Sequence, residues 1–288
     1  MKFINKFIGL PGGKSWTKSV FGASDVGRER SDNEDYFRIV PEKSLFIVAD
    51  GMGGHNAGDI ASLNASQLVD TYFSPHLIAK IQDDVDKIRE AMVDSLLNAH
   101  REILRMARGS RNYEGMGCTI VASFIRGNAL HLGHVGDARA YVCNNYGIKL
   151  LTEDHSFVME LVKKGKMTME EARLSPLKNR LNQAIGASVN ITPDYCLYPL
   201  EEGDRVLLCS DGLWDMLTDE QMLQTVMQDL PPKRICETLI DIANKAGGHD
   251  NITAVVFIYS GASPRDTKSG SDDEFMDTTG EYSFVFKE

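Results

Sequence analysis

The sequence lacks the features that direct a protein to a membrane or to nucleic acid. No apolar run approaches the roughly 18 residues of a membrane-spanning helix. The basic start MKFINKFIGLPGG contains no apolar segment of the roughly 7–15 residues that a signal peptide requires. The formal net charge of −10 disfavours nucleic acid and anionic membranes as partners, because both need a basic surface. We therefore expect a cytoplasmic protein with no transmembrane segment and no nucleic-acid partner.

Cysteine is scarce, and the glycine-rich start is not a nucleotide site. The five cysteines are odd in number and scattered, with no CxxC pair (Cys118, Cys143, Cys196, Cys209 and Cys236). This pattern favours a reducing compartment in which thiols act as small apolar groups. The string IGLPGGKS falls one glycine short of a P-loop, with Ile8 at the position of the first glycine, and no strand precedes it.

The apolar periodicity predicts blocks of strands and helices rather than a regular alternation. Strands are predicted at 44–49, in three segments of CTIVASFIRGNALHLGHVGDARAYVC, and at 194–199, 205–209 and 252–259. Helices are predicted at 57–73, 83–108, about 219–229 and 232–246, with a helical stretch at 155–190. The Gly127-Asn128 turn makes neighbouring strands antiparallel. The fold class is therefore α+β.

The two ends of the chain differ in composition from the segment between them. Residues 1–20 carry four lysines and no acid, and their apolar residues recur at helical spacing. We interpret them as a basic N-terminal extension that packs on the domain, with a docking or membrane-surface peptide as the alternative. Residues 261–288 hold seven acids against three bases and are rich in Ser, Thr and Gly, which predicts an acidic flexible tail.

Three aspartates stand next to apolar runs where the chain turns through glycine or asparagine. Asp50 lies in LFIVADGMGGH, Asp211 in VLLCSDGLWD and Asp250 in GGHDNITAVVFIY. Asp-Gly is a common turn dipeptide, so one such pair alone predicts only a turn. If the runs belong to one packed sheet system, the carboxylates can converge at an edge, where a cation must neutralise them. Carboxylate oxygens, with a backbone carbonyl at Gly51, favour Mg²⁺ or Mn²⁺.

An arginine precedes these turns at a spacing that suits phosphate recognition. The string DVGRERSDNEDYF places Arg30 four residues before Glu34 and five before Asp35. A guanidinium beside an acidic cation site can bind two phosphate oxygens with its planar fork, while the cations bind the others. Most such strings are charged surface turns, so this one carries weight only in combination with the other motifs.

Seven glycine-rich or acidic motifs follow one another along the chain. They are R-SDNED (30–35), DGMGGH (50–55), GMGCT (115–119), GHVGDARAY (133–141), LTEDHS (151–156), SDGLWD (210–215) and GGHDNIT (247–253). Taken in this order, from about Ser24 to Tyr259, they resemble the motifs of the type 2C, metal-dependent Ser/Thr protein phosphatases in their compact bacterial form. The resemblance implies a four-layer α-β-β-α sandwich of two antiparallel sheets flanked by helices. It also implies a catalytic domain at 21–260 with a variable flap at about 155–190.

The resemblance further implies a pair of Mg²⁺ or Mn²⁺ ions at one end of the sandwich. Asp50 would bridge the two ions, and Asp211 and Asp250 would complete the ligands of one. Gly51 would lend its carbonyl to the other ion, which Glu34 would reach directly or through water.

Two further assignments follow from the resemblance, and one residue departs from it. Arg30 matches the residue that receives the phosphate, and Asp137 matches the acid of a third, weaker metal in bacterial members. Many animal relatives have DGHGG where this chain has DGMGG, so Met52 cannot act as the general acid proposed for that histidine. We expect His55 to cap or pack at the following helix and the remaining histidines, including His131, His134 and His155, to be structural or surface groups.

The activity that the resemblance implies is hydrolysis of phosphoserine and phosphothreonine in proteins by a metal-bridging hydroxide, without a covalent intermediate. None of the cysteines has an arginine six positions later, as cysteine-nucleophile phosphatases require. The expected partners are phosphorylated proteins and a cognate Ser/Thr kinase, and we expect a monomer. Two alternatives remain open: a catalytically silent relative that binds a partner, and a phosphatase of small phosphorylated metabolites.

Overall fold

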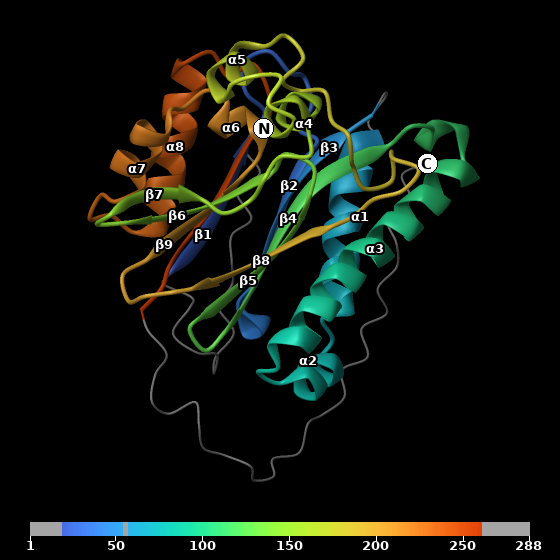
Figure 1. Cartoon of the computed structure of the whole chain (residues 1–288), viewed down its shortest axis with the longest axis horizontal. Helices are drawn as coiled ribbons and strands as arrows, with labels where there is room; N and C mark the ends of the chain where they lie inside the picture. The colour runs from blue at the N-terminus through green and yellow to red at the C-terminus, as the bar shows by residue number, and fades with distance from the viewer. Residues whose placement is uncertain (1–18, 54–56, 261–288) are drawn as a thin grey trace.

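The computed structural model describes residues 19–53 and 57–260, and in these ranges the chain forms two five-stranded antiparallel sheets that face each other (Figure 1). Sheet A has the strand order β1-β10-β9-β6-β7, and sheet B has the order β2-β3-β4-β5-β8. The strands of sheet A are β1 (Val20–Asp25), β6 (Arg139–Asn144), β7 (Gly147–Leu150), β9 (Arg205–Cys209) and β10 (Ile252–Ile258). Those of sheet B are β2 (Asp35–Val40), β3 (Leu45–Met52), β4 (Gly117–Arg126), β5 (Ala129–Val135) and β8 (Asp194–Pro199).

Helices cover the outer face of each sheet. On sheet B lie α1 (Ala57–Tyr72) and α3 (Val85–Gly109), whereas α7 (Asp219–Val226) and α8 (Pro232–Lys245) lie on sheet A (Figure 1). The shorter helices are η2 (Pro41–Lys43), α2 (Pro75–Ile81), η3 (Arg111–Tyr113), α4 (Phe157–Lys163), α5 (Met169–Leu174) and α6 (Asp211–Trp214). The fold is thus the α-β-β-α sandwich that the sequence predicts.

Three apolar clusters separate the four layers, and the alternation of side chains along β3 shows how. Leu45 and Ile47 point into the cluster between sheet B and its helices. Phe46 and Val48 point the other way, into the cluster between the two sheets. A third cluster joins sheet A to α8. Because successive side chains of a strand alternate between faces, a strand buried on both faces has an apolar run rather than an apolar-polar alternation.

The strongest periodic signals gave the correct elements. The long helix predicted at 83–108 is α3, and the side chain of Asp84 caps it by accepting a hydrogen bond from the Lys87 N–H. The strands predicted at 194–199 and 205–209 are β8 and β9. The predicted break at Gly136-Asp137 is larger than a simple turn, because the chain leaves sheet B there and enters sheet A as β6.

The segment predicted as helical at 155–190 is helical only in part. It contains α4 and α5, and the chain from 175 to 193 is irregular apart from single bridge pairs. Polar residues and exposed apolar side chains such as Leu174 leave this segment without a continuous apolar face, so no longer helix forms. We call residues 155–193 the flap. In the described ranges, no helix is both long and apolar enough to cross a bilayer.

Several elements were not predicted from the sequence, namely β1, β2, β7, α2 and α6. The predicted basic extension and acidic tail lie outside the described residues, apart from positions 19 and 20, and so does His55.

Candidate metal centre

A cavity of about 270 Å³ lies where strands of both sheets end, and every site residue predicted from the sequence lines it. These residues are Arg30, Glu34, Asp50, Gly51, Asp137, Asp211 and Asp250. Met52, Gly53, Thr119, Asn179, Leu181 and Asn251 complete the lining. A second hollow, of about 300 Å³, lies between β1 and α8 and contains none of the predicted residues.

The register of sheet B places Asp50 among polar neighbours. Asp50 lies near the end of β3, between Asp35 of β2 and Thr119 of β4. Ser210, which precedes α6, donates a hydrogen bond of 2.6 Å from its hydroxyl to the Asp35 carboxylate. Since Ser210 follows a strand of sheet A, this bond ties the ends of the two sheets together beside Asp50.

The turns that carry Asp211 and Asp250 touch each other. A Cβ atom at Gly212 would lie 2.1 Å from the carbonyl oxygen of Asn251, so only glycine allows this approach. Ser210 strengthens the junction, because its N–H donates to the Thr253 carbonyl and its hydroxyl accepts from the Thr253 N–H. The two aspartates, which are far apart in the chain, are thereby held next to each other.

Glu34 and Gly51 meet at the start of α1. The Gly51 N–H donates to the Glu34 carbonyl over 3.1 Å. A Cβ atom at Gly51 would lie 2.2 Å from the Gly58 carbonyl oxygen, and one at Gly58 would lie 2.7 Å from the Glu34 carboxylate carbon. Both glycines are therefore required for the close approach of Glu34 to the Asp50 turn. Burial raises the pKa of Glu34, whereas a hydrogen bond from the Gly58 N–H opposes that rise.

The carboxylates of the cavity repel one another. Burial raises the pKa of Asp50 well above its usual range, and the charges of Asp35 and Asp211 add to the effect. Burial, and to a lesser extent the negative charge of Asp250, raise the pKa of Asp211 to about 6. Burial, and to a lesser extent the negative charge of Asp211, raise the pKa of Asp137 well above its usual range. Although Asp50 and Asp211 open onto the cavity, the surrounding protein and the like charges disfavour their ionised forms.

The residues present fit a hard divalent cation. Oδ1 of Asp211 is buried and has no hydrogen-bond partner among the described residues, and the same is true of Oδ1 of Asp35 and Oγ1 of Thr119. Unpartnered buried carboxylate oxygens are costly, and a cation in the cavity would satisfy and neutralise them. The available donors are oxygens rather than thiolates or imidazoles, which suits Mg²⁺ or Mn²⁺.

Arg30 lies at the rim of the cavity, where Nη2 donates a hydrogen bond of 2.8 Å to Oδ2 of Asp250. Its side chain is 51% exposed, so the guanidinium is accessible to a ligand that enters the cavity. The positively charged guanidinium of Arg30 thus lies beside Asp250, a predicted metal ligand, at the entrance of the cavity rather than at its centre.

A buried platform holds the backbone of Asp137. Trp214 Nε1 donates a hydrogen bond of 3.0 Å to the Asp137 carbonyl. The guanidinium of Arg139 lies 3.6 Å from the centre of the Trp214 ring and binds both carboxylate oxygens of Asp154, at 2.9 and 2.6 Å. The preceding residue, Gly136, has φ +99°, and a Cβ there would lie 2.4 Å from the Thr119 side chain. Asp137 is therefore fixed by its neighbours rather than by its own side chain.

The comparisons with known proteins agree with this geometry. A model of the protein phosphatase 2C family matches residues 24–242. The chain belongs to the protein phosphatase 2C family. It is 37% identical over 236 residues to the protein phosphatase PhpP of Streptococcus pneumoniae, which covers 81% of this chain and 94% of that protein. It is 33% identical to the serine/threonine phosphatase stp of Listeria monocytogenes, with 81% of this chain and 92% of that protein covered. The chain is thus a metal-dependent Ser/Thr protein phosphatase.

Solved structures of this phosphatase family have the same fold. The S. agalactiae serine/threonine phosphatase matches with a TM-score of 0.77 and 37% identity, covering 83% of this chain and 99% of that chain. The catalytic domain of the serine/threonine protein phosphatase PstP, in complex with two manganese ions, matches with a TM-score of 0.69 and 33% identity, covering 83% and 96%.

Sequence reasoning missed several residues that shape the centre of the phosphatase. Asn251 locks the loop that carries Arg30 and Glu34, since Nδ2 donates to the carbonyls of Val26 and Asp32 and Oδ1 accepts from the Glu34 N–H. Its position directly after Asp250 was the available signal. Asn179 and Leu181 line the cavity from the irregular part of the flap, where no pattern indicates which side chains turn inward.

Three of the histidines expected to be structural or surface groups lie outside the cavity. His131 and His134 are buried on β5, and His155 is nearly so. None of these three lines the cavity.

Proposed function

We propose that the phosphatase hydrolyses phosphoserine and phosphothreonine in proteins with two Mg²⁺ or Mn²⁺ ions in the cavity. Asp50 would bridge the ions, and Asp211 and Asp250 would complete the ligands of one. Gly51 would offer its carbonyl oxygen to the other ion, and Glu34 would bind it directly or through water. The convergence of these carboxylates, with an orphaned buried oxygen on Asp211, is the observation that carries the proposal.

The two manganese ions of the PstP catalytic domain support this count of core ions. When bound, the core ions would supply a hydroxide that attacks phosphorus directly, and water acidified by an ion at Asp137 would supply the proton that a Ser or Thr leaving group needs.

Arg30 would bind the phosphate. Its accessible guanidinium at the cavity entrance can bind two oxygens of the phosphoryl group and neutralise charge that develops on them. Its present partner, Asp250, would be shared with a cation, which favours transfer of the guanidinium to an incoming phosphate.

The cysteines support direct attack rather than a covalent phosphoenzyme. Burial raises the pKa of all five thiols, that of Cys143 and that of Cys236 to about 12. Thiols with such pKa values stay protonated near neutral pH and are poor nucleophiles. The cavity is lined by none of them.

The cellular setting is also proposed. We place the catalytic domain at 21–260, with the basic extension and the acidic tail outside the chemistry. We propose that the enzyme acts in the cytoplasm, as a monomer, on phosphoproteins that a cognate Ser/Thr kinase produces. The Ser/Thr phosphatases to which it is similar support phosphoproteins as the substrates.

Phosphate release from a phosphothreonine peptide, measured with and without Mn²⁺, tests the proposal. We expect release that depends on Mn²⁺ and is lost in Asp211→Asn. Small phosphorylated metabolites, assayed in parallel, should be much poorer substrates. Equal or better turnover of the metabolites would favour the alternative substrate class, and full activity in excess chelator would contradict the proposed metal centre.

A further inference from the structure

His155 makes two hydrogen bonds with Gly136, the residue that precedes Asp137. The His155 N–H donates a hydrogen bond of 2.9 Å to the Gly136 carbonyl. The Gly136 N–H in turn points at the His155 ring and lies 3.2 Å from Nδ1. Because glycine at φ +99° is free to rotate, the ring bond to the Gly136 N–H fixes the peptide before Gly136, and the backbone bond to its carbonyl fixes the peptide that leads into Asp137.

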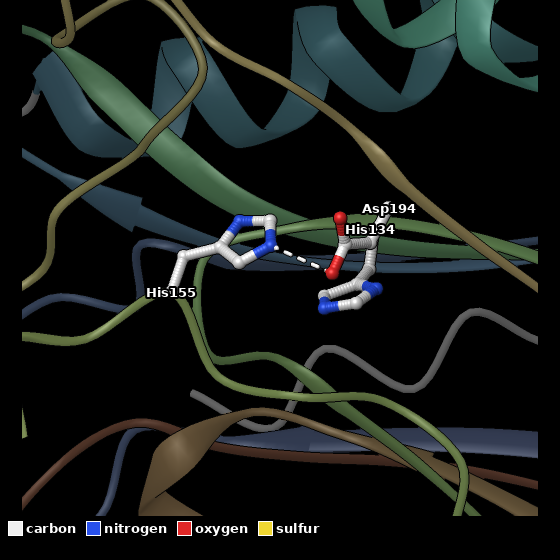
Figure 2. Close-up of side chains that lie close together, drawn as sticks. All are labelled: His134, His155 and Asp194. Carbon is white, nitrogen blue, oxygen red and sulfur yellow. Dashed lines mark ion pairs between the residues drawn. The ribbon is translucent and has the colours of Figure 1, made fainter. Parts of the chain in front are cut away.

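The hydrogen bond to Gly136 decides which ring nitrogen of His155 carries the proton. A backbone N–H can only donate, so Nδ1 must accept, and in the neutral ring the hydrogen is on Nε2. Nε2 faces Oδ2 of Asp194 at 3.3 Å, and Figure 2 shows the His155 ring directed at that carboxylate. Asp194 therefore favours the tautomer, and the ring orientation, that Gly136 requires.

The three residues come from separate parts of the chain that meet at the base of the flap. His155 is the first residue of the flap, and Asp194 is the first residue of β8, directly after the flap ends. Gly136 lies at the crossing from sheet B to sheet A. The contact between His155 and Asp194 thus closes the flap at its base, and the Nδ1 contact connects that closure to the Asp137 loop.

The same cluster has the composition of a metal site, but its hydrogen bonds oppose one. Ligand atoms of His134, His155 and Asp194 lie within 4.8 Å of one another. Nε2 of His134 donates to the Glu153 carbonyl over 2.8 Å, so only Nδ1 of that ring could bind a metal. The lone pair of His155 is used by Gly136, so its Nε2 would have to exchange a hydrogen for a lone pair before it could bind a metal. The two rings are also stacked, at 4.8 Å and 26°, rather than pointed at a common centre.

We propose that His155, oriented by Asp194, is a positioning residue whose ring holds the Gly136 N–H, and through it the turn into Asp137, in the conformation needed for the Asp137 cation. The inference rests on the proposed function, in which that cation aids departure of the Ser or Thr oxygen. Trp214 holds the Asp137 carbonyl, so the peptide groups before Gly136, before Asp137 and after Asp137 each carry a hydrogen bond. Residues that orient a metal ligand typically contribute about 10- to 100-fold to affinity or activity.

The kinetic test compares two substitutions of His155 on two substrates. In His155→Gln the side-chain amide reaches the Nε2 position and leaves the Gly136 N–H without its acceptor, whereas in His155→Asn the side-chain oxygen lies near the Nδ1 position and can accept. We expect His155→Gln to lower kcat on a phosphothreonine peptide by about 10-fold or more and to change p-nitrophenyl phosphate hydrolysis much less. His155→Asn should recover part of the loss. Asp194→Ala, at a half-exposed position, should show the same substrate dependence.

The matched control is His131→Asn. His131 is a buried histidine of β5, and its Nδ1 pairs with the Tyr195 hydroxyl of β8 at 2.7 Å, next to Asp194, but no hydrogen bond joins it to Gly136. Loss of packing alone should affect His131→Asn and His155→Gln alike, and it should affect both substrates alike.

A double-mutant cycle connects the effect to Asp137. If His155 acts through Asp137, then adding His155→Gln to Asp137→Ala should cause no further loss on the phosphopeptide, because the cation is already absent. Additive losses would overturn the inference.

The second readout is independent of activity. Equilibrium Mn²⁺ binding to the full chain, followed by electron paramagnetic resonance of free Mn²⁺, should show that His155→Gln weakens only the weakest class of site, by about 10- to 100-fold. The tight ions should be retained. Wild-type binding at the weak site, together with wild-type substrate dependence, would overturn the role of His155. If Asp137→Ala itself changes neither the weak site nor the substrate dependence, the proposed role of the Asp137 cation fails, and the inference falls with it.

Discussion

The metal-bearing end of the sandwich and the flap beside it are held in place by different kinds of contact. The carboxylates at the sandwich end sit on strand registers and on glycine-mediated backbone contacts, such as that between Gly212 and Asn251. The flap has two short helices and exposes large apolar side chains, among them Met169 at 57% and Leu174 at 80%. It contributes only Asn179 and Leu181 to the cavity lining.

Polar contacts connect the flap to the sandwich. At its start, His155 binds Gly136. Near its end, Nδ1 of His100 on α3 accepts a hydrogen bond of 3.1 Å from the Gly186 N–H. Ile185 is in addition fully buried in the cluster between sheet B and its helices, so the later part of the flap is anchored by packing. The part around α5, with its exposed apolar side chains, is the one that can shift at low cost. The comparison favours the proposal that the sandwich end binds the metals, with the exposed part of the flap left to adjust how a substrate is held.

The largest expected effect is the loss of turnover when a carboxylate at the sandwich end is neutralised. Asp250→Asn should abolish turnover yet leave a folded protein, because the change removes like-charge repulsion from the clustered carboxylates. In chelator its melting temperature should equal or exceed that of the wild type, as calorimetry can measure. Asp241→Asn, at an exposed position on α8, is the matched control and should keep full activity. Near wild-type turnover in Asp250→Asn would remove Asp250 from the centre.

Substitution of Arg30 tests whether phosphate is recognised at the cavity entrance, between the sandwich end and the flap. Arg30→Ala should lower kcat/KM by a factor equivalent to about 1.5–3 kcal/mol of transition-state stabilisation, the scale of a hydrogen bond to a charged group. Arg30→Lys should recover only part, because lysine lacks the planar fork. Steady-state kinetics on a phosphopeptide measure both. An unchanged kcat/KM in Arg30→Ala would place phosphate recognition elsewhere.

The flap should affect substrate binding without affecting the metals. Lys178, next to Asn179, binds Asp215, which directly follows α6. Lys178→Met should raise KM for a phosphopeptide by up to about fivefold, the scale of a partly exposed ion pair, and leave Mn²⁺ affinity unchanged. Lys164→Met, which removes an exposed pair within the flap, serves as control. A clear loss of Mn²⁺ affinity in Lys178→Met would break the division between the two regions.

The smallest expected effect concerns Asp35 and pH. Burial raises the pKa of Asp35 from 3.8 to about 7. Between about pH 4 and 7 the folded, metal-free protein therefore holds a proton that the unfolded chain has released, so the free energy of unfolding falls as pH rises through this window. In Asp35→Asn that fall should be shallower by the contribution of one proton. Denaturant unfolding in chelator at several pH values measures it, and equal slopes would show that Asp35 is ionised throughout.

Local patterns in the sequence predict the α+β class and three of the carboxylates, whereas the sandwich itself was implied by the family resemblance. The long apolar spacing of α3 and the apolar runs of β8 and β9 are strong signals, and Asp50, Asp211 and Asp250 each belong to a recognisable turn. In contrast, β1 and β2 mix polar with apolar residues and are fixed by pairing with distant strands. Tertiary partners, rather than local propensity, determine such strands.

The rest of the centre depends on contacts that no local pattern shows. The role of Asp35 arises from its register with Asp50 and its bond to Ser210, which is 175 positions away in the chain. The hydrogen bond between His155 and Gly136 likewise forms only because the chain passes from sheet B to sheet A at Gly136. In the flap, irregular backbone removes the periodicity from which inward-facing residues could be inferred.

The most direct test of the account counts metal ions rather than turnover. The central claim is that the carboxylates at the sandwich end hold two cations jointly, with Asp50 between them. Equilibrium dialysis of the full chain against Mn²⁺, followed by elemental analysis, should give two tightly bound ions in the wild type and in Lys178→Met. In Asp50→Asn both tight ions should be lost together. Retention of two tight ions in Asp50→Asn would contradict the claim.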